Sequence, residues 1–184
     1  MDALEALHNR TSVPKLADPA PSGKCLDNIC RAAFRAADHA VLRPWRFLLV
    51  SGDARERLGD LFAEAAMARE PAMDEAGLAR LRAKPLRAPL IIVTISCHRE
   101  HPKVPELEQD LSAAAATQNM LLAAYAQDVG AFWRTGSMAY DPVVRQGLGL
   151  AVNEKIIGFL YLGRKDGATK RLSDPEIADY FSYW

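Results

Sequence analysis

The chain has 184 residues, a length typical of one domain, and 49% of its residues are hydrophobic, which is enough for a buried core. Its 23 basic and 23 acidic residues cancel, which excludes an overall field that would draw the chain to nucleic acid or to an anionic membrane. Any anion that it binds must be held by a local cluster of cations. We therefore predict a single domain, residues 1–184, without nucleic-acid or membrane partners.

The ends and the cysteines bear on cellular location. The first ten residues, MDALEALHNR, lack the basic-then-apolar layout of a secretion signal. The longest apolar run, residues 89–95, is too short to cross a bilayer. Three widely spaced cysteines are typical of reduced thiols in a cytoplasmic protein. Cys97, His98 and His101 fall close together, but a fourth ligand is missing and the spacing matches no zinc pattern. We expect a cytoplasmic protein without a bound metal.

The first half of the chain is predicted to be mostly helical. Residues 2–9 fit a short amphipathic helix with Leu4 and Leu7 facing inward, and the proline-rich residues 13–23 fit a surface connection. Asp53, followed three residues later by a glutamate, has the spacing of a capping box and predicts a helix start. The predicted elements of this half are helices over 2–9, 24–36, 53–69 and 74–83 and a strand over 46–51.

The second half contains the longest predicted helix, residues 105–128, which would be on the order of 36 Å long. The small residues 113–116 would let another backbone approach it closely, and Gly130 is expected to end it. Asp141 before Pro142 predicts the start of a further helix. Strands are predicted over 90–96, 131–135 and 155–162, followed by a basic segment and an aromatic tail.

This order of elements is rich in helices, has about four strands and contains no βαβ repeat. It favours an α+β fold, with one mixed sheet flanked by helices, over a doubly wound fold. The sequence has no glycine-rich dinucleotide fingerprint, no phosphate-binding loop and no GxSxG nucleophile motif. The four histidines and three cysteines offer no nucleophile with an obvious base. If the protein is an enzyme, a cofactor is expected to supply the chemistry.

A candidate phosphate site follows the first predicted helix, at Arg10, Thr11 and Ser12. A guanidinium group offers two parallel donors to a phosphate, and hydroxyl groups add neutral donors. An arginine at a helix C-terminus also complements the helix dipole. Taken alone, the segment is compatible with either role.

A second candidate segment runs from Arg35 through Asp38 and His39 to the rigid pair Pro44-Trp45. Loops held by rigid elements are where cofactor contacts collect. The alternative is that Trp45 belongs to the core and His39 caps the surface.

A third candidate segment is Trp133-Arg134-Thr135, which follows the long helix. The tryptophan could form the wall of a site for a planar ring while the arginine holds an anion. The alternative is a buried tryptophan beside a solvated arginine.

Together, in this order, the segments resemble the nitroreductase family. MDALEALHNRTS is similar to the N-terminal helix and Arg-x-Ser motif of these enzymes, and RAADHAVLRPWRFLLV to their first flavin loop. The stretch from KVPELEQDL to AFWRTG resembles the central helix and second flavin loop, and KIIGFLYLG the closing strand. The resemblance runs nearly end to end. In its short length and in the Asp-His pair of the first loop, the chain most resembles the short, YdjA-type branch of NAD(P)H nitroreductases.

The resemblance implies an FMN-dependent oxidoreductase that works as a homodimer with flavin sites at the interface. NADH or NADPH would deliver hydride to FMN, and an electron-poor nitro compound or quinone would then take the electrons. No catalytic side chain is implied, because the flavin itself accepts and gives the hydride. The alternative is a flavin-binding module with little turnover, used for storage or regulation.

The resemblance also assigns residues by position. The first two segments and Trp133 to Thr135 would contact FMN, and the end of the long helix would contact the nicotinamide nucleotide. Relatives tend to have glycine where this chain has Asp128, whose carboxylate could repel a pyrophosphate. Pro14 stands where larger relatives keep a lysine, which leaves open the cation that stabilises reduced flavin. The implied cofactor-binding residues are Arg10, Thr11, Ser12, Arg35, His39, Trp133, Arg134, Thr135, Ala123, Ala124, Tyr125, Ala126, Gln127 and Asp128.

Overall fold

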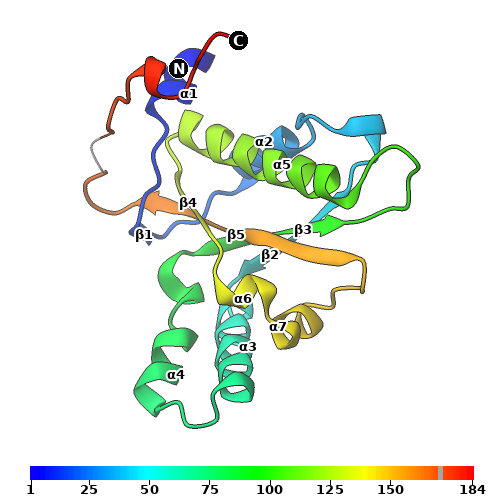
Figure 1. The fold of residues 1–184 in the computed structure, drawn as a ribbon. Helices are drawn as coiled ribbons and strands as arrows, with labels where there is room; N and C mark the ends of the chain where they lie inside the picture. Colours follow the sequence, from blue (N-terminus) through cyan, green and yellow to red (C-terminus); the bar gives the residue numbers. More distant parts are fainter. Residues whose placement is uncertain (170–171) are drawn as a thin grey trace.

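The structure, a computed structural model, describes residues 1–169 and 172–184; Lys170 and Arg171 of the predicted basic segment lie outside the described residues. A five-stranded sheet crosses the middle of the molecule, with α2 and α5 on one face and α3, α4, α6 and α7 on the other (Figure 1). The predicted α+β class is confirmed. The helices are α1 Ala3–Asn9, α2 Gly23–Ala33, α3 Ala54–Arg69, α4 Glu75–Arg82, α5 Glu106–Ala126, α6 Ser137–Tyr140 and α7 Pro142–Gly147, with 3-10 turns η1 His39–Val41, η2 Pro85–Arg87 and η3 Ile177–Asp179.

Every strand pairing in the described part of the chain is antiparallel, so the predicted mixed sheet is wrong. Between β2 and β3, helices α3 and α4 pack together and bring the chain back to the end of β2. The last residue of β2, Ser51, therefore pairs with the first residue of β3, Leu90. Between β3 and β4, the single helix α5 makes the two strands run in the same direction, but β5 lies between them. The strands are β1 Leu16–Ala17, β2 Trp45–Ser51, β3 Leu90–Cys97, β4 Gly130–Arg134 and β5 Glu154–Lys165.

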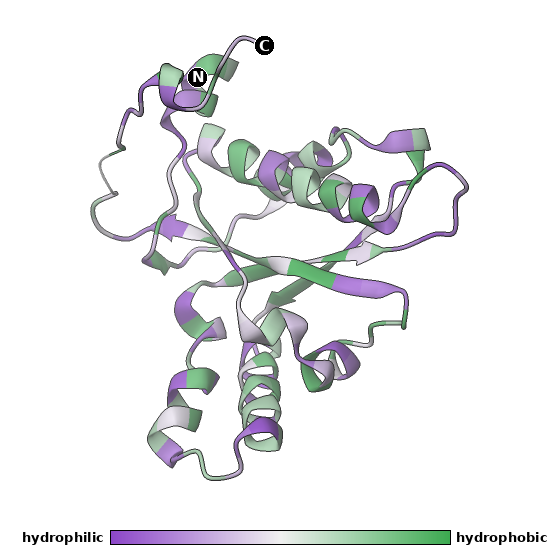
Figure 2. Cartoon of the chain, viewed as in Figure 1, coloured by the Kyte–Doolittle hydropathy of each residue, from purple (hydrophilic) through white to green (hydrophobic). Residues whose placement is uncertain are grey.

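Strand β3 is the centre of the core and is buried except for its last residue. Ile91 and Val93 pack into the hydrophobic cluster on the α3 side, whereas Leu90 and Ile92 pack into the cluster on the α5 side. Because helices cover both faces, the strand reads as a continuous apolar run rather than an alternating one. Figure 2 shows the hydrophobic residues along the sheet.

Helix α5 ends at a left-handed residue, and that residue is Asp128 rather than the predicted Gly130. Asp128 has φ 61°, and the N–H groups of Asp128 and Val129 donate to the carbonyls of Tyr125 and Ala124. This is the hydrogen-bond pattern of a Schellman motif, whose left-handed position is usually glycine. Gly130 instead already belongs to β4.

Several N-terminal predictions are also wrong. Leu4 and Leu7 are 63% and 56% exposed, and only Ala6 of α1 is buried. The predicted surface connection over 13–23 contains the short strand β1 and the buried Val13. The expected capping box of α3 is not formed, since the N-cap residue has a helical backbone and no side-chain hydrogen bond.

Candidate functional site

The predicted phosphate segment lies beside the start of β4. Arg10 is the C-cap of α1, and three residues later the Val13 N–H donates to the carbonyl of Ala131 (2.9 Å), which fixes the segment against the strand. Arg10 Nη1 is buried and has no hydrogen-bond partner within the described residues. A buried donor without a partner is costly, and a charged one is especially so. Arg10 with the half-buried Thr11 and Ser12 therefore fits an anion such as a phosphate.

Arg35 lines a cavity of about 600 Å³ between α1, α2 and α5. Its other lining residues include Leu7, Ala123 and Ala126. The structure thus brings one predicted flavin residue next to two of the positions implied for the nicotinamide nucleotide.

His39 lies at the opposite end of α5. Its Nδ1 is 2.5 Å from Glu108 Oε2, in the first turn of the helix. Along the helix axis, Glu108 is roughly 22 Å from Ala123. Within one chain, His39 and the end of α5 therefore cannot contact the same small ligand.

The loop that contains His39 is strained. Ala40, Val41 and Arg43 have positive φ values of 60°, 53° and 48°, and such conformations cost on the order of 1–3 kcal/mol each in residues other than glycine. The Asp38 carboxylate accepts a hydrogen bond from the Arg43 N–H (2.7 Å), which closes the loop. Strain of this kind is typical of ligand-binding loops.

Trp133 and Arg134 point to opposite faces of the sheet, because side chains alternate along a strand. Trp133 packs with the α5-side cluster, whereas the Arg134 guanidinium stacks 3.9 Å from the ring of Phe132, which packs with the α3-side cluster. A Cβ at Gly158 would lie 2.0 Å from Trp133 Nε1, so glycine there makes room for the indole. Within one chain, the two side chains therefore lie on opposite faces of the sheet. The exposed Thr135 follows directly.

The residues implied for the nicotinamide nucleotide differ in exposure. Ala124 is fully buried, and Tyr125 is half-buried. The Gln127 amide bonds to Asn28 and to two backbone carbonyls. Asp128 is exposed, and the hydrogen bond from Lys165 (2.7 Å) lowers the pKa of its carboxyl. Lys165 therefore places a positive charge beside this carboxylate.

The nitroreductase family model matches residues 7–164 of the chain. The chain belongs to the nitroreductase family. It is 41% identical over 185 residues to "Putative NAD(P)H nitroreductase YdjA" of Escherichia coli K12, with both sequences fully covered. A nitroreductase-like family protein from Bacillus cereus has the same fold, with a TM-score of 0.84, 24% identity and coverage of 100% of this chain and 96% of that one. A Bacteroides fragilis nitroreductase with bound FMN superposes with a TM-score of 0.73, 22% identity and full coverage of both chains.

This nitroreductase-family chain also has a basic cavity that the sequence reasoning missed. It measures about 330 Å³ and is lined by Lys84, Arg87 and Arg134, together with Thr135. The only sequence signal was the run KPLR before β3, which contains two cations and no acid. Nothing in the sequence placed this run next to the segment after β4.

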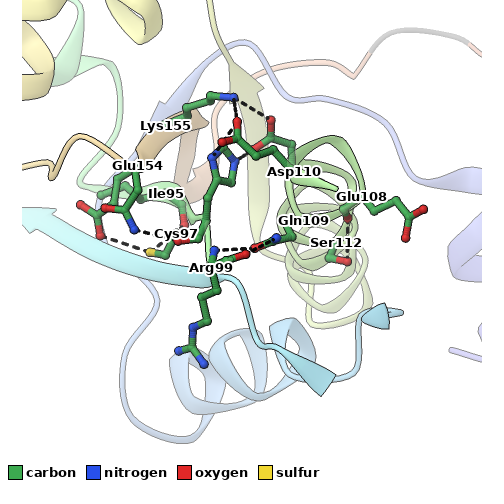
Figure 3. A network of polar contacts seen from close by, with 12 residues as sticks. Ile95, Cys97, Arg99, Glu108, Gln109, Asp110, Ser112, Glu154 and Lys155 are labelled. Carbon is green, nitrogen blue, oxygen red and sulfur yellow. Dashed lines mark hydrogen bonds and ion pairs between the residues drawn. The ribbon is translucent and has the colours of Figure 1, made fainter. Parts of the chain in front are cut away.

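A polar network, in contrast, anchors the start of α5 to β3 and β5 in this nitroreductase-family chain (Figure 3). His98 Nε2 lies 2.6 Å from Asp110 Oδ1, and Lys155 lies 3.5 Å from Asp110 Oδ2. Burial and the hydrogen bond to Glu154 raise the pKa of the Cys97 thiol to about 11, so it is not a reactive thiolate at neutral pH. Within residues 1–169 and 172–184, no His, Cys, Asp and Glu side chains are grouped to hold a metal ion, and no helix is long and apolar enough to span a bilayer.

Proposed function

We propose that the chain is an FMN-dependent oxidoreductase that uses NADH or NADPH to reduce electron-poor nitro compounds or quinones. The main support is Arg10, whose buried Nη1 atom has no partner among the described residues and lies at the position where the family motif holds the FMN phosphate. Family membership and the FMN bound to the Bacteroides fragilis relative agree with this. The relative YdjA is named an NAD(P)H nitroreductase.

Each segment has a proposed part in binding. Arg10, Thr11 and Ser12 would hold the phosphate through charge-assisted and neutral hydrogen bonds. Arg35 and His39 would approach the cofactor from the first loop, and Trp133 to Thr135 from the second. When bound, FMN supplies hydride acceptance and donation, and these residues orient the ring and limit its contact with water.

The flavin site is proposed to lie between two copies of the chain. Arg35 and His39 flank different parts of α5, which suggests that one chain alone does not complete the site. Leu107 and Leu111 on α5 are 67% and 58% exposed, and Leu4 and Leu7 are exposed too. The aromatic side chains of the tail, Tyr180, Phe181, Tyr183 and Trp184, are exposed as well. A two-fold interface along α5 would cover these side chains.

The nicotinamide nucleotide is proposed to bind at the end of α5, along residues 123–128. The cavity beside Ala123 and Ala126 opens next to this segment. Asp128, at the end of this segment, is paired with Lys165, so its carboxylate does not face a bound nucleotide without a neighbouring cation.

The test is the spectrum of the purified protein. It should be yellow and release FMN, not FAD, on denaturation, and it should oxidise NADH or NADPH faster when a nitro or quinone acceptor is added. A colourless protein that cannot be reconstituted with FMN would refute the proposal. Bound FMN without steady-state turnover would favour the storage or regulatory module.

A further inference from the structure

The basic cavity on the α3 side of the sheet has the character of a second anion site. Lys84 directly precedes the 3-10 turn η2, Arg87 is the last residue of that turn, and Arg134 is the last residue of β4. Aromatic rings, including those of Phe159 and Tyr161, form the apolar wall. The cavity of about 330 Å³ thus combines aromatic rings with cationic side chains.

The three cations have no acidic partner among residues 1–169 and 172–184, and none of the cavity-lining residues described there is Asp or Glu. Within the described part of the chain, Lys84, Arg87 and Arg134 form no ion pair, and Arg134 Nε is buried without a hydrogen-bond partner. The half-buried Arg46, in contrast, lies 2.7 Å from Glu154. Uncompensated positive charge in a partly closed cavity attracts an anion.

The electrostatics of the cavity agree with this geometry. Burial and then the charge of Arg87 lower the pKa of Lys84, and burial lowers the pKa of Arg134. Burial also raises the pKa of Tyr161 to about 12, so the phenol stays neutral and does not neutralise the cations. An anionic ligand would relieve the repulsion between Lys84 and Arg87.

We propose that this cavity binds the negatively charged edge of a flat ring, separately from the phosphate at Arg10. Two ligands of the proposed reaction share that chemistry. One is the flavin ring, which gains negative charge at its pyrimidine edge on reduction; the other is an aromatic acceptor with a carboxylate. Thr135 belongs both to this cavity and to the second flavin loop, so a ring bound here would either be the flavin or lie next to it. The inference rests on the proposed function.

The experiment uses Lys84→Gln and Arg87→Gln in the purified protein, with Arg80→Gln as a control. Arg80 is an exposed arginine of α4 that does not line the cavity, so its loss changes the net charge equally. Three quantities are measured: the affinity for FMN, the midpoint potential of bound FMN, and KM for 4-nitrobenzoate against its neutral analogue 4-nitrobenzamide.

Each outcome either decides whether the cavity binds the flavin ring or the aromatic acceptor, or overturns the anion site. If the cavity faces flavin, each cavity variant lowers the midpoint potential; a tenfold weaker preference for reduced FMN corresponds to about 30 mV for a two-electron couple. If it faces the acceptor, KM for 4-nitrobenzoate rises roughly tenfold while that for 4-nitrobenzamide stays constant. If neither the midpoint potential of bound FMN nor the KM for 4-nitrobenzoate changes beyond the Arg80→Gln control, the anion site is refuted.

A failure of the proposed function itself would look different. Wild-type protein would then bind no FMN at all, whatever the variants do. In that case the cavity is tested by calorimetric titration of 4-nitrobenzoate into wild type and Arg87→Gln. Equal binding by the two proteins, or no binding, would overturn the anion site as well.

Discussion

Glu154 is expected to stabilise the fold chiefly through its charge. Its carboxylate, at the start of β5, accepts hydrogen bonds from Arg46 Nε (2.7 Å), Arg46 Nη2 (2.8 Å), the Ala151 N–H (2.9 Å) and Cys97 Sγ (3.2 Å). The Arg46 hydrogen bond is the main reason that the pKa of Glu154 falls from 4.5 to about 2. This fall corresponds to about 3 kcal/mol of folding free energy.

The sign of the pH dependence follows from the lowered pKa. The stabilisation is fully present above the unfolded pKa of 4.5 and is lost as the pH falls through the folded pKa of about 2. Glu154→Gln should therefore be less stable than wild type by about 3 kcal/mol at pH 7, but by only about 1–1.5 kcal/mol at pH 3.

Urea unfolding followed by circular dichroism at pH 7 and pH 3 measures both differences. The protein concentration is held fixed, because a dimer gains apparent stability with concentration. Glu100→Gln, which alters an exposed glutamate, is the control and should change stability by less than about 0.5 kcal/mol. A difference between Glu154→Gln and wild type that stays the same at both pH values would show that shape, not charge, accounts for the effect.

Three further predictions concern cofactor, helix end and assembly. Arg10→Ala should weaken FMN binding roughly tenfold to a hundredfold in an equilibrium titration, and Ser12→Ala by less; an unchanged affinity would place the phosphate elsewhere. Asp128→Gly should unfold at or above the wild-type temperature, whereas Asp128→Val should unfold roughly 2–4 °C lower, because only glycine tolerates the left-handed backbone without strain; the reverse order would contradict the strain argument. Ala114→Arg should abolish the dimer and FMN binding together, as seen by light scattering with a flavin titration; a stable monomer that still binds FMN tightly would refute the shared site.

Local signals predicted the elements well where they were strong. The long stretch of helical periodicity in α5 and the apolar run of β3 predicted the ends of both elements to within two residues. Asp141 is the N-cap of α7, and its side chain accepts a hydrogen bond from the Val143 N–H at 2.9 Å, as the Asp-Pro pair predicts. In these cases the relevant partners are near in sequence or determined by burial alone.

Long-range pairing could not be predicted in the same way. Strand β1 has only two residues and exists because Leu16 and Ala17 pair with the far end of β5. The antiparallel order depends on α3 and α4 folding back on each other, which their individual patterns do not reveal. The basic cavity likewise forms only because the folded sheet brings Lys84 and Arg134, fifty positions apart in the sequence, to the same cavity.

Strand β4 links the two candidate anion positions. In the described part of the chain, β4 pairs only with β5, and the Val13 N–H bonds to Ala131 at its start. Arg10 lies near that start, and Arg134 lies at the other end with Thr135 beyond it. From Ala131 to Thr135 the strand extends on the order of 13 Å. A ligand with its phosphate at Arg10 and a charged ring edge at Arg134 would have to run along this open edge. FMN, which has a phosphate at one end and a polar ring at the other, has that shape, so of the two proposed ring ligands only the flavin would connect the phosphate cradle with the basic cavity.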